Sequence, residues 1–304
     1  MGALILFLAA FLWGSAFVAQ KLAAGHMGPF AVLFFRNLVG GVFLLAVCFA
    51  SRRGIRAAFT RKAALGGLVC GILLFFASLC QQIGIECTTP GISAFLTCNY
   101  LVLVPVFWFL AHFAGLGGRA RPPRGVLAAV ALALAGSYLL CVAPGESFRL
   151  GRGEAWTLLC AALFALQILA VDRFAPGTDI FAFSCLQQFA GTACSLPFLA
   201  LASERAHYTL ADVSAAFWPL MYIAVFSSGI AFTCQNYGQM RCPPVLAAIV
   251  MSLESAIGAL CGWICLGDAL SARQAAGCAI LFFAVVFSQV ASAMAAGKDR
   301  KECR

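Results

Sequence analysis

The amino-acid sequence predicts an all-α integral membrane protein with ten transmembrane helices, built from two inverted five-helix repeats. Three features predict this fold. Hydrophobic residues make up 63% of the 304-residue chain and charged residues only 10%, so a soluble fold could not bury the apolar surface. The apolar residues gather in stretches long enough to cross a membrane, and the second half of the chain repeats the first.

Ten apolar stretches follow one another, and each can cross a hydrocarbon core roughly 30 Å thick as a helix. They cover residues 3–22, 29–50, 64–85, 91–113, 125–143, 153–171, 179–202, 214–239, 243–266 and 273–295. Turn-forming pairs separate them, including Gly28-Pro29, Pro122-Pro123 and Pro176-Gly177. Ser271 and Gln274 form a capping box at the start of the last stretch. The loops are too short to hold a separate soluble domain.

Basic residues predict the orientation, because Lys and Arg collect on the cytoplasmic side of a membrane protein. Most of the 20 Lys and Arg residues lie in one set of alternate loops and in the C-terminal tail. We therefore expect a multi-pass protein of the cell (inner) membrane with both termini in the cytoplasm. The net charge of +9 is then a topology signal, so we expect lipid as a partner and no nucleic acid.

The second half of the chain aligns with the first at positions that punctuate the spans. The segment Gln81-Gln82-Ile83-Gly84 through Pro90 matches Gln235-Asn236-Tyr237-Gly238 through Pro244, and Phe30-Ala31 with Gly40 matches Phe181-Ala182 with Gly191. This alignment sets Arg36 opposite Gln187 and Asn37 opposite Gln188. We therefore predict a first repeat at residues 1–145, a second repeat at 146–297 and a short basic cytoplasmic tail at 298–304.

Five spans per repeat is an odd number, so the second repeat must enter the membrane from the opposite side. Inverted repeats commonly enclose a central site that opens alternately to each face, because the two halves can exchange conformations. The repeat therefore favours a carrier that works by alternating access over a channel.

Several short motifs add to this interpretation. They are Trp13-Gly14-Ser15-Ala16-Phe17, Pro29 followed by Arg36, Gln81-Gln82-Ile83-Gly84 running into Thr88, Ala94-Phe95-Leu96-Thr97, Val104-Pro105-Val106, Ser252-Leu253-Glu254 and Gly262-Trp263-Ile264-Cys265-Leu266-Gly267-Asp268. In order and spacing they resemble the drug/metabolite transporter superfamily, and within it the ten-helix EamA-type proteins. The resemblance covers essentially the whole chain. The sequence departs from the family pattern at Ser255, where proline is frequent, and at Asp268, where glutamate is usual. The first half has Gly115-Leu116-Gly117-Gly118 where a Gly-Glu pair would recur.

The resemblance implies a helical bundle with a central cavity that carries a small organic metabolite, such as an amino acid or a related solute. We expect export, a small-molecule substrate and no cofactor, and the sequence leaves a homodimer and proton coupling open. An integral membrane enzyme acting on a lipid-linked substrate is the alternative, and a non-transporting scaffold is a third. We expect no enzyme, because nucleophiles, bases and carboxylates do not cluster at one depth.

Glu254 and Arg36 are the ionisable side chains that we expect to bind the substrate or couple its transport, because charge inside a membrane is costly and usually functional. Glu254 lies in the middle of the ninth span, where it is a candidate for substrate binding or proton coupling. A protonated carboxyl group bonded to a neighbouring helix is the structural alternative. The planar guanidinium of Arg36 suits a carboxylate or phosphate. Its alternatives are an outer-interface position and an internal pair with Glu254.

Polar and aromatic residues near mid-depth are weaker candidates for the substrate site, since such residues also serve in packing. These are Asn99, Tyr100, Trp13 and Ser15. Amides near the span ends could act as gates or cavity ends, or simply face interfacial water; they are Gln81, Gln82, Gln235 and Asn236. We expect no metal site, because His26, His112 and His207 fall in different segments.

Overall fold

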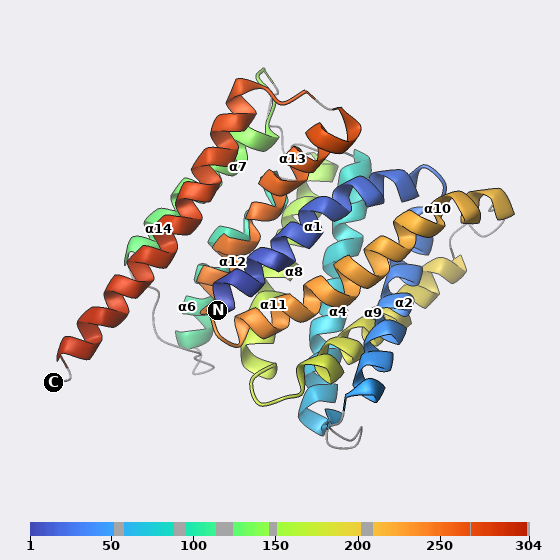
Figure 1. Cartoon of the computed structure of the whole chain (residues 1–304), viewed down its shortest axis with the longest axis horizontal. Coiled ribbons are helices and arrows are strands. Elements are labelled where there is room, and N and C mark those ends of the chain that lie inside the picture. The colour runs from blue at the N-terminus through green and yellow to red at the C-terminus, as the bar shows by residue number, and fades with distance from the viewer. Residues whose placement is uncertain are drawn as a thin grey trace.

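The computed structural model describes residues 1–51, 58–87, 95–113, 124–145, 151–201, 209–267 and 269–302, and within these ranges the regular structure is helical. The helices of the first half are α1 (Gly2–Ala24), α2 (Pro29–Ala50), α4 (Arg61–Cys87), α6 (Tyr100–Phe113) and α7 (Arg124–Cys141). Those of the second half are α8 (Arg152–Phe174), α9 (Ile180–Leu201), α10 (Leu210–Tyr222), the π-helix η2 (Ile223–Ala231), α11 (Phe232–Gln239), α12 (Pro244–Met251), α13 (Leu253–Leu266) and α14 (Ala272–Glu302). Figure 1 shows them as one elongated bundle.

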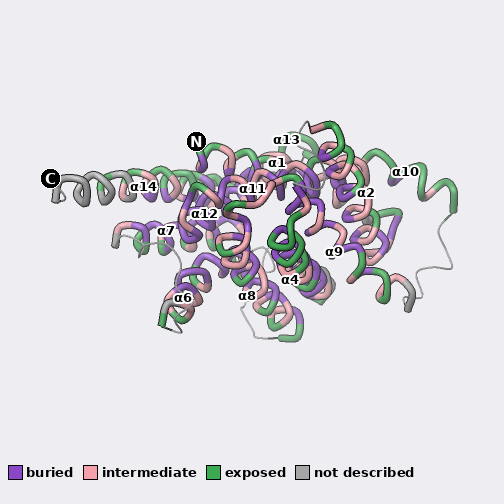
Figure 2. The backbone as a smooth tube through the Cα atoms, turned by 90° about the horizontal axis from the view of Figure 1, so that it is seen from below, coloured by how far each residue is buried: buried purple, intermediate pink, exposed green. Residues whose placement is uncertain are grey.

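Seven helical segments of the described chain are long enough and apolar enough to cross a membrane. Two shorter apolar helices accompany them. The seven are Gly2–Gln20, Pro29–Ala50, Arg61–Gln81, Arg152–Phe174, Leu210–Gln239, Pro244–Cys265 and Ala272–Ala291, and the shorter ones are Phe95–Ala111 and Gly125–Cys141. Many residues of α10 and α14 are exposed (Figure 2). The large apolar side chains of Trp218 and Phe283 are among the exposed ones. Exposed apolar surface of this extent suits a lipid environment.

The two halves of the chain interlock along two antiparallel helix pairs, α2 with α9 and α7 with α14 (Figure 1). In the first pair, Phe30 near the start of α2 stacks on Phe198 near the end of α9, with ring centroids 6.0 Å apart. Eleven residues further along α2, the carbonyl oxygen of Gly41 accepts a hydrogen bond from Sγ of Cys185, which lies earlier in α9. The helices α7 and α14 are also antiparallel. Gly125 at the start of α7 packs on Ala291 late in α14, and Gly136 further along α7 packs on Gly277 early in α14.

Glycines at corresponding positions of the repeat make corresponding contacts with the other half. A Cβ added to Gly84 of α4 would collide with Thr157 of α8 and approach the carbonyl of Gly153. A Cβ added to Gly238 of α11 would collide with Leu6 of α1 and approach the carbonyl of Gly2. The sequence repeat pairs Gly84 with Gly238, so the structure pairs the start of α1 with the start of α8. The first helix of each half therefore packs on the third span of the other half.

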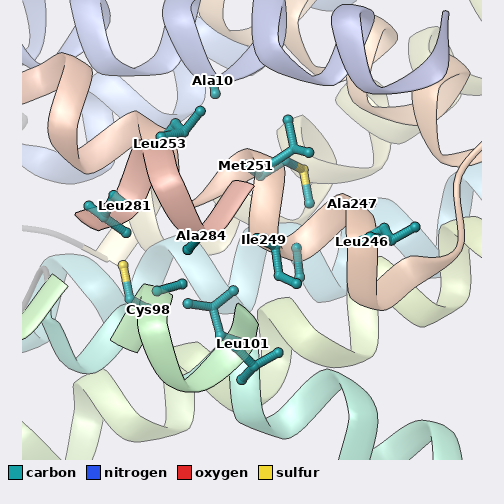
Figure 3. Packing of buried hydrophobic residues seen from close by; sticks show 14 of the residues in the cluster. Ala10, Cys98, Leu101, Leu246, Ala247, Ile249, Met251, Leu253, Leu281 and Ala284 are labelled. Carbon is teal, nitrogen blue, oxygen red and sulfur yellow. The ribbon is translucent and has the colours of Figure 1, made fainter. Parts of the chain in front are cut away.

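The largest hydrophobic cluster surrounds α12, in which every residue from Pro244 to Met251 is buried. A helix that is apolar all round is stable only where protein or lipid covers every face. Figure 3 shows Ile249 and Met251 of α12 between Ala10 of α1 above and Leu101 of α6 below. Leu281 of α14 closes the cluster on a third side. The core thus joins elements of both halves.

Close helix approach at Gly71 gives a test of this packing. An added Cβ would lie 2.6 Å from the Cβ of Ala190 on α9. We expect Gly71→Ala to destabilise the protein by about 1–3 kcal/mol, because crowding of this kind outweighs the gain of about 1 kcal/mol in helix propensity. Thermal unfolding of the detergent-solubilised protein should show a melting temperature several degrees lower. Gly25→Ala is the matched control, since its Cβ would lie 3.5 Å from the nearest atom, the carbonyl oxygen of Leu22. Equal melting temperatures for the two variants would contradict the predicted crowding.

Candidate functional site

A cavity of about 90 Å³ lies between the two halves of the chain. One water needs roughly 10–15 Å³ on the same scale, so the cavity has room for a small organic molecule or several waters. Its lining combines charged, amide, hydroxyl and aromatic side chains. The lining residues are Trp13, Phe17, Gln20, Arg36, Ser78, Gln81, Thr97, Tyr100, Phe164, Gln167, Ile168, Ser227, Phe232, Gln235, Met251 and Glu254.

The π-helix η2 holds Arg36 in the cavity wall. Nε of Arg36 donates to Oγ of Ser228 at 2.9 Å, and Nη2 lies 3.5 Å from Oγ of Ser227. Hydroxyl oxygens carry no full charge, so they fix the guanidinium without neutralising it. The side chain therefore keeps its positive charge and its remaining N–H donors available to a ligand.

Backbone carbonyls of η2 also accept bonds from neighbouring helices, which fits the wide turn of a π-helix and its frequent use at functional sites. Nε1 of Trp13 donates to the carbonyl of Ser227 at 3.3 Å, and Nε2 of Gln188 donates to the carbonyl of Ser228 at 2.6 Å. The Trp13 ring lies 4.9 Å from the ring of Phe232. These contacts fix the indole as one wall of the cavity.

Kinks place Tyr100 and Glu254 beside the cavity. A turn at Cys98 and Asn99 precedes α6, which begins at Tyr100, and Ser252 separates α12 from α13. Nδ2 of Asn99 bonds the carbonyls of Phe95 and Leu96, and Oγ of Ser252 bonds the carbonyl of Ile249. Side chains thus bond carbonyls at each kink, as backbone inside a membrane requires.

The cavity lies where equivalent positions of the two repeats face one another. The sequence alignment that matches Gln81 with Gln235 continues without a gap. It matches Tyr100 with Glu254, and both residues line the cavity. The same spacing gives the lining pairs Ser78 with Phe232 and Thr97 with Met251. The glycine contacts, which match Gly2 with Gly153 and Leu6 with Thr157, add Trp13 with Phe164 and Phe17 with Ile168. Four lining residues have counterparts outside the lining, namely Gln20, Arg36, Gln167 and Ser227; the counterpart of Arg36 is the fully buried Gln187. Most of the positions are symmetric, whereas the charges are not.

Arg36 and Glu254 face the same cavity without an ion pair between them. Among the residues that the structure describes, the Glu254 carboxyl group accepts no hydrogen bond and meets no basic side chain within 4 Å. Two opposite charges held apart in a low-dielectric space attract a molecule that carries both signs. The arrangement does not match the internal Arg36–Glu254 pair considered from the sequence.

The structure brings six of the sequence-predicted residues together at the cavity, namely Glu254, Arg36, Tyr100, Trp13, Gln81 and Gln235. Three others lie outside its lining. Asn99 bonds the kink carbonyls, Ser15 bonds the hydroxyl of Tyr222 at 2.7 Å, and Asn236 is buried between α11 and α9. The side chain of Gln82 lies outside the described part of the structure, as do Asp268 and Gly115-Leu116-Gly117-Gly118.

The sequence analysis missed several lining residues that lie one helical turn, three or four residues, from a predicted site residue. Ser78, Thr97, Phe232 and Met251 each lie three residues before a predicted site residue, and Phe17 lies four residues after Trp13. Residues at these spacings share a helix face. Gln20, Gln167 and Ser227 carried no such signal.

A buried amide cluster adjoins the cavity at α11. Nδ2 of Asn236 donates to Oε1 of Gln187 and to Oγ of Ser184, both at 2.9 Å. Gln239 donates to the carbonyl of Ile168 at 3.0 Å. These side chains are fully buried, so α8, α9 and α11 are joined by polar contacts away from water. No group of three or more His, Cys, Asp or Glu in the described residues could hold a metal ion.

Comparison with known proteins gives a family match over most of the chain. Residues 1–142 and again residues 151–289 match the EamA-like transporter family. An uncharacterized transporter of Archaeoglobus fulgidus is 26% identical over 279 residues, which cover 92% of this chain and 82% of the relative.

Two further similarities agree with this match. A WAT1-related chloroplastic protein of Arabidopsis thaliana is 28% identical over 90% of this chain and 66% of its own length. One solved crystal structure has the same fold with a TM-score of 0.79 and 19% identity, covering 95% of this chain and 96% of the other.

The amide cluster predicts an unequal response to two similar substitutions. Asn236→Leu removes bonds to Ser184 and Gln187 and leaves their buried oxygens without this donor, which costs about 1–3 kcal/mol for each unsatisfied group. Gln289→Leu removes an Nε2 that is buried without a partner, so it should be neutral or stabilising. Thermal unfolding in detergent should show a lower melting temperature only for Asn236→Leu. A drop of the same size in both variants would show that the cluster contributes no specific stability.

Proposed function

The chain belongs to the EamA-like transporter family, and from this membership we propose that it carries a free amino acid or a related zwitterion across a membrane by alternating access. The protein is a multi-pass membrane protein of the drug/metabolite transporter superfamily, and its family and the Archaeoglobus relative are named as transporters rather than enzymes. The substrate class, the direction and the mechanism are the parts that we propose here.

The observation that carries the proposal is the pair of opposite, separate charges in one cavity. Arg36 offers N–H donors to a carboxylate, and Glu254 offers an acceptor to an ammonium group. An α-amino acid brings both groups, so its binding would neutralise both side chains at once. An anion or a cation alone would leave one of the two charges unmatched in a medium of low dielectric constant, which is costly.

The size of the cavity supports a small substrate. At about 90 Å³, it has room for roughly six to nine water-sized groups. A free amino acid is of this size, whereas a lipid-linked sugar or a nucleotide is much larger. The aromatic rings of Trp13, Phe164 and Phe232 supply apolar surface for the carbon skeleton.

Alternating access requires two halves that can exchange conformations, and the helix pairing supports an inverted arrangement. The α2–α9 and α7–α14 pairs consist of equivalent helices from the two halves, and both pairs are antiparallel. A two-fold axis in the membrane plane makes such pairs antiparallel, whereas an axis along the membrane normal would make them parallel. We therefore propose ten spans in two inverted repeats, residues 1–145 and 146–297.

In the proposed cycle the amide cluster of α11 is a closed gate. Asn236 joins α11 to α9 through Gln187 and Ser184, and this contact would part when the cavity opens toward that end. In the first half, Gln82 of α4 is the sequence counterpart of Asn236, and Gln81 and Gln82 are the gate candidates for the other end of the cavity. The basic loops and the tail at residues 298–304 favour a cytoplasmic location, so the proposal puts this cluster and both termini on the cytoplasmic side of the cell membrane, with export as the direction.

Reconstitution of the purified protein in liposomes tests the function. Liposomes loaded with unlabelled amino acids should take up labelled amino acid by exchange, and Arg36→Met should slow this exchange about 10- to 100-fold, because a hydrogen-bonded charge contributes about 1.5–3 kcal/mol. Arg152→Met changes an exposed arginine outside the cavity and serves as the control. Exchange by Arg36→Met at the rate of the unchanged protein would contradict the proposed site, and a lack of exchange by the unchanged protein would contradict the proposed substrate class.

Glu254 gives a separate prediction about coupling. A glutamine at this position keeps the shape and the hydrogen-bonding capacity of the side chain but cannot bind or release a proton. We expect Glu254→Gln to be expressed normally and to lose the dependence of transport on pH, measured as uptake at a series of external pH values. An unchanged pH profile would remove Glu254 from the coupling mechanism.

A further inference from the structure

The guanidinium group of Arg36 has two edges that can bind an oxygen pair, and the π-helix η2 occupies one of them. On the side edge, Nε lies 2.9 Å from Oγ of Ser228 and Nη2 lies 3.5 Å from Oγ of Ser227. The other edge is the fork of Nη1 and Nη2, which can give a carboxylate two parallel hydrogen bonds. In the described part of the structure Nη1 bonds no protein group, and it keeps accessible surface because Arg36 lines the cavity.

Neighbouring helices hold both serines in place. Nε1 of Trp13 on α1 donates to the carbonyl of Ser227, and Nε2 of Gln188 on α9 donates to the carbonyl of Ser228. On α2, Gly40 lies one turn after the arginine, and an added Cβ there would come within 3.1 Å of Cβ of Ser228. Both serines are fully buried. The two hydroxyl groups therefore have a fixed position relative to the guanidinium.

The π-helix lets two consecutive residues reach the same side chain. Its backbone bonds join residues five apart, so it has more residues per turn than an α-helix and adjacent side chains diverge less. Ser227 and Ser228 are adjacent, and both contact Arg36. Their hydroxyl oxygens accept hydrogen bonds without a full charge. A carboxylate in either place would instead compete with the carboxylate of a substrate.

The other half of the chain lacks the arginine and the serines together. The sequence repeat sets Gln187 against Arg36, and it sets Leu73 and Leu74 of α4 against the two serines of η2. The leucines belong to an unbroken α-helix. Packing between equivalent helices is thus possible with leucine at these positions. The serines accompany the arginine, as expected if their role is to hold it.

We propose that Ser227 and Ser228 are positioning residues that hold Arg36 by its side edge, so that the substrate carboxylate binds end-on to Nη1 and Nη2. This inference rests on the proposed function, which assigns the α-carboxylate to Arg36. Two parallel N–H donors match the two oxygens of a carboxylate, whereas an amide offers one oxygen. Holding the guanidinium in advance removes the cost of ordering a long side chain when the substrate binds.

Competition by substrate analogues tests this role. The full chain is reconstituted in liposomes, and exchange of a labelled mixture of the common amino acids is inhibited by the unlabelled mixture or by the mixture of their α-amides, which keep the ammonium group and lack the carboxylate. We expect the unchanged protein to prefer the acids about tenfold or more, and Ser228→Ala to prefer them less than about threefold.

The outcomes separate the two proposals. A preference unchanged in Ser228→Ala would overturn the positioning role and leave the proposed function standing. If the unchanged protein shows no exchange, or exchange without a preference for the acids, the proposed function itself is overturned.

Ser195→Ala is the matched control. Ser195 is a buried serine of α9 outside the cavity lining, and its hydroxyl donates to the carbonyl of Thr192 in the same helix at 2.7 Å. This variant should keep the preference for the acids. An equal loss of preference in Ser195→Ala and Ser228→Ala would show a general loosening of the protein and overturn the specific role of Ser228.

Arg36→Lys decides the proposal if Ser228→Ala fails to fold. Lysine keeps the positive charge but has a single ammonium group, which cannot bond the serines along one edge and a carboxylate along another. We expect this variant to prefer the acids less than about threefold. Retention of the full preference would overturn end-on binding to the guanidinium fork.

Discussion

Polar groups inside this protein must be satisfied by other parts of the protein, because surrounding lipid offers neither donors nor acceptors. This constraint explains where the described amides lie. Gln188 bonds a carbonyl of the π-helix, Asn99 bonds the carbonyls at a kink, and Asn236 joins α11 to α9. Several of these amides still keep one buried atom without a partner, among them Gln188 and Asn236 outside the cavity and Gln167 and Gln235 in its wall. Arg36 and Glu254 differ from them because their charged groups line the cavity, where a substrate can bond them.

The two five-helix repeats form the helix bundle that encloses the cavity. The charged residues of the cavity lie at positions where the two repeats differ. Equivalent glycines let α4 approach α8 and let α11 approach α1, so the two halves enclose the cavity with equivalent surfaces. Glu254 lines the cavity and its counterpart in the other repeat, Tyr100, lines it as an uncharged residue. Arg36 lines the cavity as well, whereas its counterpart Gln187 does not. Two like halves with like charges would suit a symmetric ligand. The unequal halves suit a molecule whose ends differ, as the ends of an amino acid do.

Much of the candidate site could be predicted because charge and aromatic rings are rare or conspicuous inside apolar spans. Glu254, Arg36, Tyr100 and Trp13 were identified in this way and do line the cavity. Ser15 and Asn99 have the same depth and similar chemistry but lie outside the lining, and Gln167 lines it although no sequence feature singled it out. Sequence position sets how deep a residue lies in its span. The face that it presents depends on how the helix is rotated against its neighbours.

The sequence by itself determined the membrane environment, the internal repeat and the presence of opposite charges within the spans, because these follow from composition, hydropathy and self-similarity. Only the tertiary structure decided which polar residues meet. The π-helix that holds Arg36, the kink at Ser252 before Glu254 and the bond between Gln167 and Gln235 all depend on the packing of helices far apart in the chain. Local sequence does not encode such contacts, since the partner of each buried group is chosen by which helices lie side by side in the folded protein.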